Sequence, residues 1–179
     1  MDHAWLLDSA TTDTQSRFEQ LFQDHHSRIY AYLCRLVGDH KQAEDLTQDT
    51  FVKAFRALNR LPAEANARAW LYRIATNTAL DWLRRRRLIN WLPLFDDDHQ
   101  QSAPDLAEAT LESITVQRTL LQLPPRYRTP LVLYAYQGFS TQEIADILHI
   151  SPGAVRTRLF RAREKFRRLY AQEQEEGKR

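Results

Sequence analysis

Residues 140–168 have the sequence STQEIADILHISPGAVRTRLFRAREKFRR, and this stretch decides the fold because it predicts two helices joined by a tight turn. Ser140 and Glu143 have the spacing of a capping box, in which each side chain accepts the other residue's backbone amide, so a short helix begins there. Ser151 before Pro152 gives a second start signal, a capping serine followed by proline at the first helical position. The pattern is that of a helix-turn-helix.

The second of these two helices carries residues suited to DNA. Its apolar positions, from Val155 to Leu169, recur at helical spacing and predict a buried stripe. The opposite face and its flanks suit the major groove, and they comprise Gly153, Arg156, Thr157, Phe160, Arg161 and Arg163. Arg161 can pair with a guanine, and Phe160 can touch a thymine methyl group. A solvated basic helix in a bundle is the alternative, but an outward phenyl ring argues against it.

Composition favours an all-helical, soluble chain with a nucleic-acid partner. Only 4 of the 179 residues are glycine, and 27% are charged. The net charge of +2 hides segregation: 13 basic against 8 acidic residues over 17–88, 10 against 3 over 117–170, and 6 acids without a base over 89–116. Cys34 is the single cysteine, which excludes an internal disulfide or a cysteine-based metal cluster. No signal peptide or long apolar run is found, so we expect a cytoplasmic protein.

The N-terminal half predicts three helices. Residues 1–13 have no clear periodicity and are expected to form a loose arm. Helices follow over 14–37, 41–58 and 67–87, with Gly38 as a left-handed cap and Asn66 as an N-cap. The same periodicity places Phe22 and Phe55 among the inward positions.

Two helical faces in this half stand out. The second helix presents Asp45, Gln48, Asp49, Val52 and Arg56, which are either simply solvated or a docking surface for a basic partner. The third presents a mixture suited to stacking on bases and holding phosphates, with these residues outside or at the edges: Arg68, Tyr72, Arg73, Thr76, Asn77, Asp81 and Arg84. Arginines 84–87 offset the helix dipole, but four in succession exceed what capping needs.

The connector changes character. An apolar patch over 88–95 precedes three aspartates and a polar stretch, which indicates a linker. A helix is expected from about residue 105 to 122. Pro130 then either kinks the following helix or marks its true start, with Thr129 as cap. A charged tail ends the chain over 171–179.

Four segments carry a family resemblance: AEDLTQDTFVKAF (43–55), ARAWLYRIATNTALDWLRRRR (67–87), LPPRYRTPLVLYAYQGFSTQEIADIL (123–148) and SPGAVRTRLFRAREKFR (151–167). They resemble the two defining regions of bacterial RNA polymerase sigma factors of the extracytoplasmic function (ECF) class. The resemblance implies an all-α chain of two small helical domains: a region 2-like bundle over 14–88 and a region 4-like helix-turn-helix domain over 111–170, joined by a flexible acidic linker over 89–110.

The resemblance also implies roles. Core RNA polymerase would be bound by Asp45, Gln48, Asp49 and Val52. The minus 10 element would be bound, with loop 59–66 holding an extruded base, by Asn59, Arg60, Asn66, Arg68, Trp70, Tyr72, Arg73, Asn77, Arg84 and Arg85. The minus 35 element would be read by the groove-facing set that begins at Gly153. Promoter DNA and an anti-sigma factor are the other expected partners, with no metal, cofactor, catalytic residue or membrane insertion.

Two other functions are weighed against this one. A stand-alone helix-turn-helix regulator would need a dimerisation segment, and none is recognisable. A nucleic-acid enzyme would need clustered acids or histidines at ligand spacing, whereas His25 and His26 are adjacent and point different ways. The apolar patch at 91–95 is also a candidate for packing the two domains into a compact, inactive form.

Overall fold

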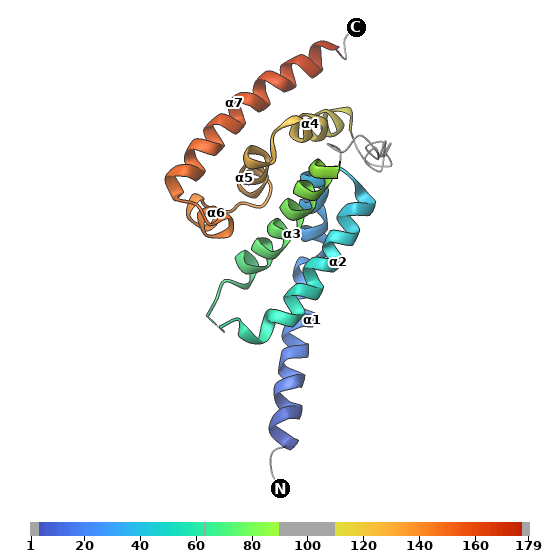
Figure 1. The fold of residues 1–179 in the computed structure, drawn as a ribbon, viewed down its shortest axis with the longest axis vertical. Helices are drawn as coiled ribbons and strands as arrows, with labels where there is room; N and C mark the ends of the chain where they lie inside the picture. The colour runs from blue at the N-terminus through green and yellow to red at the C-terminus, as the bar shows by residue number, and fades with distance from the viewer. Residues whose placement is uncertain (1–3, 63, 90–109, 177–179) are drawn as a thin grey trace.

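The chain is all-helical, as expected. The computed structural model describes residues 4–62, 64–89 and 110–176, and these contain no strand. The elements in chain order (Figure 1) are α1 (Ala4–Val37), α2 (His40–Ala57), the 3-10 helix η1 (Leu58–Arg60), α3 (Ala67–Ile89), α4 (Leu111–Gln122), α5 (Pro125–Ala135), α6 (Thr141–Leu148) and α7 (Pro152–Glu176). Most of the expected linker and the apolar patch at 91–95 lie outside the described residues.

Helices α1, α2 and α3 pack around a core that includes Ile29, Leu33 and Leu71, all fully buried. Asp39 caps α2 by accepting the Gln42 amide at 2.9 Å. The inward placement of Phe22 and Phe55 is wrong, because they are 40% and 45% exposed. Both rings lie at the edge of the bundle, where they pack against neighbouring aromatic rings instead of entering the core.

The first helix is longer than expected. It begins at Ala4, so the loose arm predicted for residues 1–13 is wrong over 4–13. Those residues contain no glycine or proline, so nothing in the sequence stops a helix from extending backwards. The search for an apolar repeat missed this extension of the helix, because such a repeat marks a helix face that packs against a core and not a helix as such.

Helices α4 to α7 form the second bundle, and the helix-turn-helix is present. The Ser140 hydroxyl accepts the Glu143 amide, and the Glu143 carboxylate accepts the Ser140 amide at 2.9 Å, which is the expected capping box. Ser151 caps α7 through the Ala154 amide at 3.1 Å. Pro130 lies inside α5, which begins at Pro125, so the alternative in which Thr129 starts the helix is wrong.

The two bundles pack against each other. Helix α3 lies along α6, and α1 lies against α4 and α5, so the C-terminal helices cover one flank of the N-terminal bundle (Figure 1). Gly38 shows how close this approach is. It has φ +76°, and a Cβ atom there would clash with the Leu121 side chain of α4. The buried apolar residues accordingly form one continuous core across both bundles.

Candidate polymerase and nucleic-acid interfaces

The outer face of α2 is a compact polar stripe. Asp45, Gln48, Asp49 and Val52 are separated by three, one and three residues, so they share one face of the helix, and all four are exposed. Val52 is 48% exposed among these polar groups. Within the described residues the one ion pair joins Arg84 to Asp81, so neither α2 carboxylate is neutralised by a bonded cation there. The stripe therefore offers acceptors and negative charge to a basic partner.

The outer face of α7 is equally open. All six groove-facing residues named from the sequence are exposed, and Phe160 is 62% exposed. Gly153 has no atom closer than 3.9 Å to where a Cβ would lie, so the backbone is accessible at that point. Arg163 lies over the Tyr134 ring at 5.0 Å, and hydrogen bonding with Arg161 lowers the pKa of Tyr127. The face therefore combines arginines that contact neighbouring tyrosine rings with the exposed ring of Phe160.

Helix α3 differs from both, because part of its expected nucleic-acid face is covered. The exposed members of the expected set are Asn59, Arg60, Asn66, Asn77, Arg84 and Arg85, whereas Arg68, Trp70 and Arg73 are partly buried. The placement of Tyr72 and Thr76 on the outer face or at its edge is wrong, since both are fully buried. Tyr72 is covered by the neighbouring C-terminal bundle, where it contacts Gln137 and Phe139, whereas Thr76 is buried inside its own bundle against Tyr32 of α1.

Tyr72 is held between the two bundles. Its hydroxyl donates to the Gln137 side-chain oxygen, and its ring meets the Phe139 ring edge-on at 4.9 Å. A second edge-on contact, at 5.1 Å, joins it to Tyr32, whose hydroxyl lies 2.7 Å from the Thr76 hydroxyl. Burial raises the pKa of Tyr72, so the phenol stays neutral and acts as a donor.

Arg68 makes the second part of this contact. Its guanidinium donates to the backbone carbonyl of Gln137 and lies 4.1 Å above the Phe139 ring. One turn earlier, Asn66 caps α3 through the Ala69 amide at 2.9 Å and also donates to Glu143 of α6 at 3.4 Å. The start of α3 is thus bound to the turn after α5 and to α6.

A hollow of about 370 Å³ lies beside the loop that was expected to hold an extruded base. The loop and α3 supply one wall, including Leu61, Asn66 and Trp70, and α6 supplies the other with Glu143 and Asp146. The lining thus carries two carboxylates on the α6 side and Arg73 on the α3 side.

Within residues 4–62, 64–89 and 110–176, no group of three or more histidine, cysteine, aspartate or glutamate side chains is placed to hold a metal ion. None of the described helices is long and apolar enough to span a membrane.

Comparison with known families decides the assignment. The family model "Sigma-70 region 2" matches residues 21–89, and "Sigma-70, region 4" matches residues 113–166. The chain belongs to the sigma-70 family. Its N-terminal bundle, α1 to α3, is therefore called region 2 below, and its C-terminal bundle, α4 to α7, region 4. A stand-alone helix-turn-helix regulator is not favoured, because region 2 has no place in it.

Curated relatives place this sigma factor in the ECF class. It is 34% identical over 171 residues to the RNA polymerase sigma-H factor of Pseudomonas aeruginosa, with 89% of each chain covered. It is 31% identical over 166 residues to the ECF RNA polymerase sigma factor SigW of Bacillus subtilis, covering 86% of this chain and 89% of SigW.

A solved structure agrees with the fold. The sigma factor RpoE of Bartonella quintana, crystallised in complex with the anti-sigma factor NepR, superposes with a TM-score of 0.73. The two share 25% sequence identity, and the match covers 86% of this chain and 96% of that one.

Sequence reasoning missed several residues that join region 2 to region 4, among them Gln137 and Arg128. Arg128 is 6% exposed, and its guanidinium donates to the carbonyls of Leu36 in α1 and of Leu123, the latter at 3.1 Å. Burial lowers the pKa of Arg128 to about 10, which leaves it charged at neutral pH. Arg128 lies in the polar first turn of α5, before the apolar run over 131–136, so the sequence offered no signal for its burial.

Proposed function

We propose that this sigma factor docks on core RNA polymerase through the polar stripe of α2 and reads the minus 35 element with α7. The observation that carries the proposal is that one chain presents two exposed faces of opposite character, acidic on α2 and basic on α7. Carboxylates and amides on α2 match an arginine-rich protein surface, and arginines on α7 match DNA phosphates and guanine edges. One element binds the enzyme while the other selects the template.

The minus 10 element is assigned to α3 and the loop before it. Trp70 and Tyr72 supply rings that stack on unpaired bases, and Arg84 and Arg85 supply exposed cations for the backbone. The covered position of Tyr72 supports a further step: region 4 must leave α3 before single-stranded DNA binds. We call the contact between region 2 and region 4 the seam. The apparent affinity for that DNA is then proportional to the fraction of molecules in which the seam is open.

The same surfaces suit an inhibitory partner. The Bartonella quintana complex pairs a sigma factor with an anti-sigma factor, and we extend that kind of partner to this chain. We further assign the protein to the cytoplasm, where RNA polymerase acts, and assign it no catalytic activity of its own.

The decisive test is transcription by core RNA polymerase on a promoter library with wild type and with Asp45→Arg/Asp49→Arg. Each charge-assisted hydrogen bond lost in a partly desolvated contact costs about 1.5 to 3 kcal/mol, so loss of both carboxylates should lower promoter-specific transcripts at least about 100-fold. A matched control, Glu112→Arg/Glu175→Arg, makes the same change in net charge at exposed positions outside the stripe, and should retain activity.

Two results would contradict the proposal. Unchanged transcripts from Asp45→Arg/Asp49→Arg would reject the docking face while leaving the promoter surfaces in place. Absence of transcripts from the wild type, together with tight specific binding of duplex DNA by the protein alone, would reject the sigma mechanism for this chain.

A further inference from the structure

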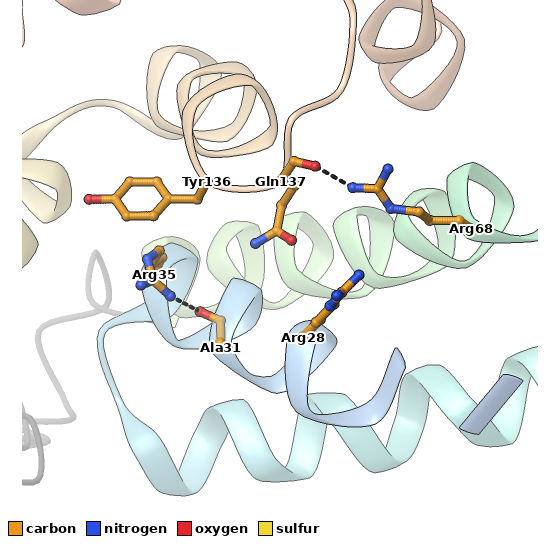
Figure 2. Close-up of a pocket in the computed structure, with 6 residues that line it drawn as sticks. All are labelled: Arg28, Ala31, Arg35, Arg68, Tyr136 and Gln137. Carbon is orange, nitrogen blue, oxygen red and sulfur yellow. Dashed lines mark hydrogen bonds between the residues drawn. The ribbon is translucent and has the colours of Figure 1, made fainter. Parts of the chain in front are cut away.

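A second hollow, of about 360 Å³, lies on the seam between region 2 and region 4. Figure 2 shows it between α1, α3 and the turn that follows α5. Region 2 contributes Arg28, Ala31, Arg35 and Arg68, and region 4 contributes Tyr136 and Gln137. Nothing in the polymerase or promoter roles assigned above uses the α1 side of this hollow.

The lining contains three arginines and no acid. In Figure 2 the three guanidinium groups stand around the open space, coming from two different helices. Two carboxylates lie outside the lining, and of these Glu143 interacts with a lining arginine, Arg68. Asp24 influences His25 beside it, and Glu143 is already engaged with Ser140 in the capping box of α6. The hollow therefore has a positive potential that the surrounding protein does not cancel.

Polar nitrogens in and beside the hollow lack hydrogen-bond partners. The Nε of Arg68 is a buried donor without an acceptor, although the terminal nitrogen of this side chain donates to Gln137. Nδ1 of His25, which donates or accepts according to the tautomer of the ring, is also buried without a partner. Burial lowers the His25 pKa, Asp24 raises it, and Arg68 and Arg28 lower it. Arg35 is held in place by the Ala31 carbonyl at 3.1 Å and by the Tyr136 ring at 4.3 Å. The buried Arg68 donor without an acceptor indicates that something else supplies an acceptor oxygen there.

We propose that this hollow binds a phosphate group, either as free phosphate or as the phosphoryl group of a small metabolite. Guanidinium groups pair with phosphate oxygens through parallel hydrogen bonds, and several around one point favour a multiply charged anion. The volume lies at the small end of ligand pockets, which is too confined for a folded partner. Arg28, Arg35 and Arg68 hold the anion, while Tyr136 and Gln137 close the region 4 side.

Binding at this seam has a regulatory consequence. Because both regions line the hollow, an anion bound there stabilises the closed arrangement and lowers the population that exposes Tyr72. This consequence depends on the proposed role of α3 in promoter binding, whereas anion binding itself does not. The two ideas can therefore fail separately.

The test is calorimetric titration of the full chain with inorganic phosphate, pyrophosphate and ATP at constant ionic strength set by chloride. We expect saturable binding of one ligand per chain. Arg28→Gln should weaken it about tenfold or more, since a charge-assisted contact is lost. Arg17→Gln is the matched control, because it lies three helical turns earlier on the same exposed face of α1, roughly 16 Å away, and it should change the affinity less than about twofold.

The three ligands and one further variant sharpen the outcome. Equal affinity for all three ligands assigns the site to free phosphate, and affinity that rises with phosphoryl number assigns it to a phosphorylated metabolite. Tyr136→Ala removes part of the region 4 wall and should also weaken binding. Non-saturable binding, equal losses in Arg17→Gln and Arg28→Gln, or full affinity in Tyr136→Ala would overturn the seam site. Far-UV circular dichroism confirms that each variant is folded.

Discussion

The faces of α7 and α3 that are proposed to bind nucleic acid differ in their exposure to solvent. On α7 every residue assigned to the groove is exposed, whereas on α3 Tyr72 is fully buried under region 4. The same helical arithmetic predicts both faces. That arithmetic identifies the residues that leave the core of their own bundle, but it says nothing about what another bundle places over them. Under the proposed function, the exposed face of α7 can bind duplex DNA directly, whereas the covered face of α3 must first be released.

The seam that causes this difference is built from a few polar contacts rather than from apolar area alone. Gln117 donates to the Cys34 carbonyl at 3.2 Å, Arg128 donates to the Leu36 carbonyl, and Tyr72 donates to Gln137. Water replaces such bonds when the regions separate, so each contributes only about 0.5 to 1.5 kcal/mol net, or more where charged. An interface of this kind is suited to opening and closing.

Among the variants that test the seam, Arg128→Ala is expected to have the largest effect on stability. It removes the buried guanidinium, leaves the Leu36 and Leu123 carbonyls without their donor, and creates a void. The free energy of unfolding should fall by about 3 to 5 kcal/mol. Urea unfolding followed by circular dichroism measures it, with the exposed Arg126→Ala as control and a loss below about 1 kcal/mol there. Similar losses in both variants would show that Arg128 does not anchor the seam.

Substitutions at two glycines distinguish the cost of backbone strain from the cost of a clash at the seam. Gly38 and Gly138 have φ of +76° and +69°, but only Gly38 has a neighbour, Leu121, where a Cβ would lie. Gly138→Ala should cost about 1 to 2 kcal/mol from strain. Gly38→Ala should cost roughly 1 to 3 kcal/mol more, because α4 must move away. Equal losses in urea unfolding would mean that α1 and α4 are not pressed together in solution.

The open face can be tested by itself. Arg161→Ala should lower discrimination at one base position of the minus 35 element by about 1 to 3 kcal/mol. Arg84→Ala should instead weaken all promoters similarly, because a phosphate contact carries no sequence information. Holoenzyme binding to matched and mismatched promoters measures both. An Arg161→Ala loss that is the same for matched and mismatched promoters would reject the base-reading role.

The smallest expected change is an increase in the affinity of α3, the covered face, for single-stranded DNA. Gln137→Ala removes the acceptor of the Tyr72 hydroxyl without altering region 2. Loss of one hydrogen bond of about 1 kcal/mol should open the seam and tighten binding of a labelled minus 10 single strand by up to roughly fivefold. Gln142→Ala, an exposed position on α6, should leave binding unchanged. Weaker or unaltered binding by Gln137→Ala would show that closure does not mask α3.

Local signals predicted much of this molecule because their physics is local. The capping box at Ser140, the N-caps at Asn66 and Ser151 and the left-handed cap at Gly38 all involve partners within four residues. The exposure of the α2 and α7 faces also followed from spacing within one helix. These are the parts of the candidate interfaces that sequence reasoning reached.

The parts that failed depend on distant partners. Tyr72 and Thr76 meet Gln137 and Tyr32, which are 65 and 44 residues away in the chain. Of the two alternatives for Pro130, the start at Thr129 failed for a related reason, since neighbouring helices bury α5 whatever its intrinsic propensity. Arg128 was overlooked because its acceptor is a carbonyl, which no sequence pattern displays.

Gln137 makes one contact through its backbone and one through its side chain, and this affects what mutations at that position can do during evolution. Its carbonyl accepts from Arg68 and its side chain accepts from Tyr72. A replacement at position 137 erases only the second contact, since every amino acid carries the first. Under the proposed mechanism, replacements at position 137 adjust the proportion of open molecules in small steps, whereas replacements at positions 68 or 72 also alter the proposed promoter-binding surface. One residue can thus tune the threshold of a transcriptional response without redesigning what the response recognises.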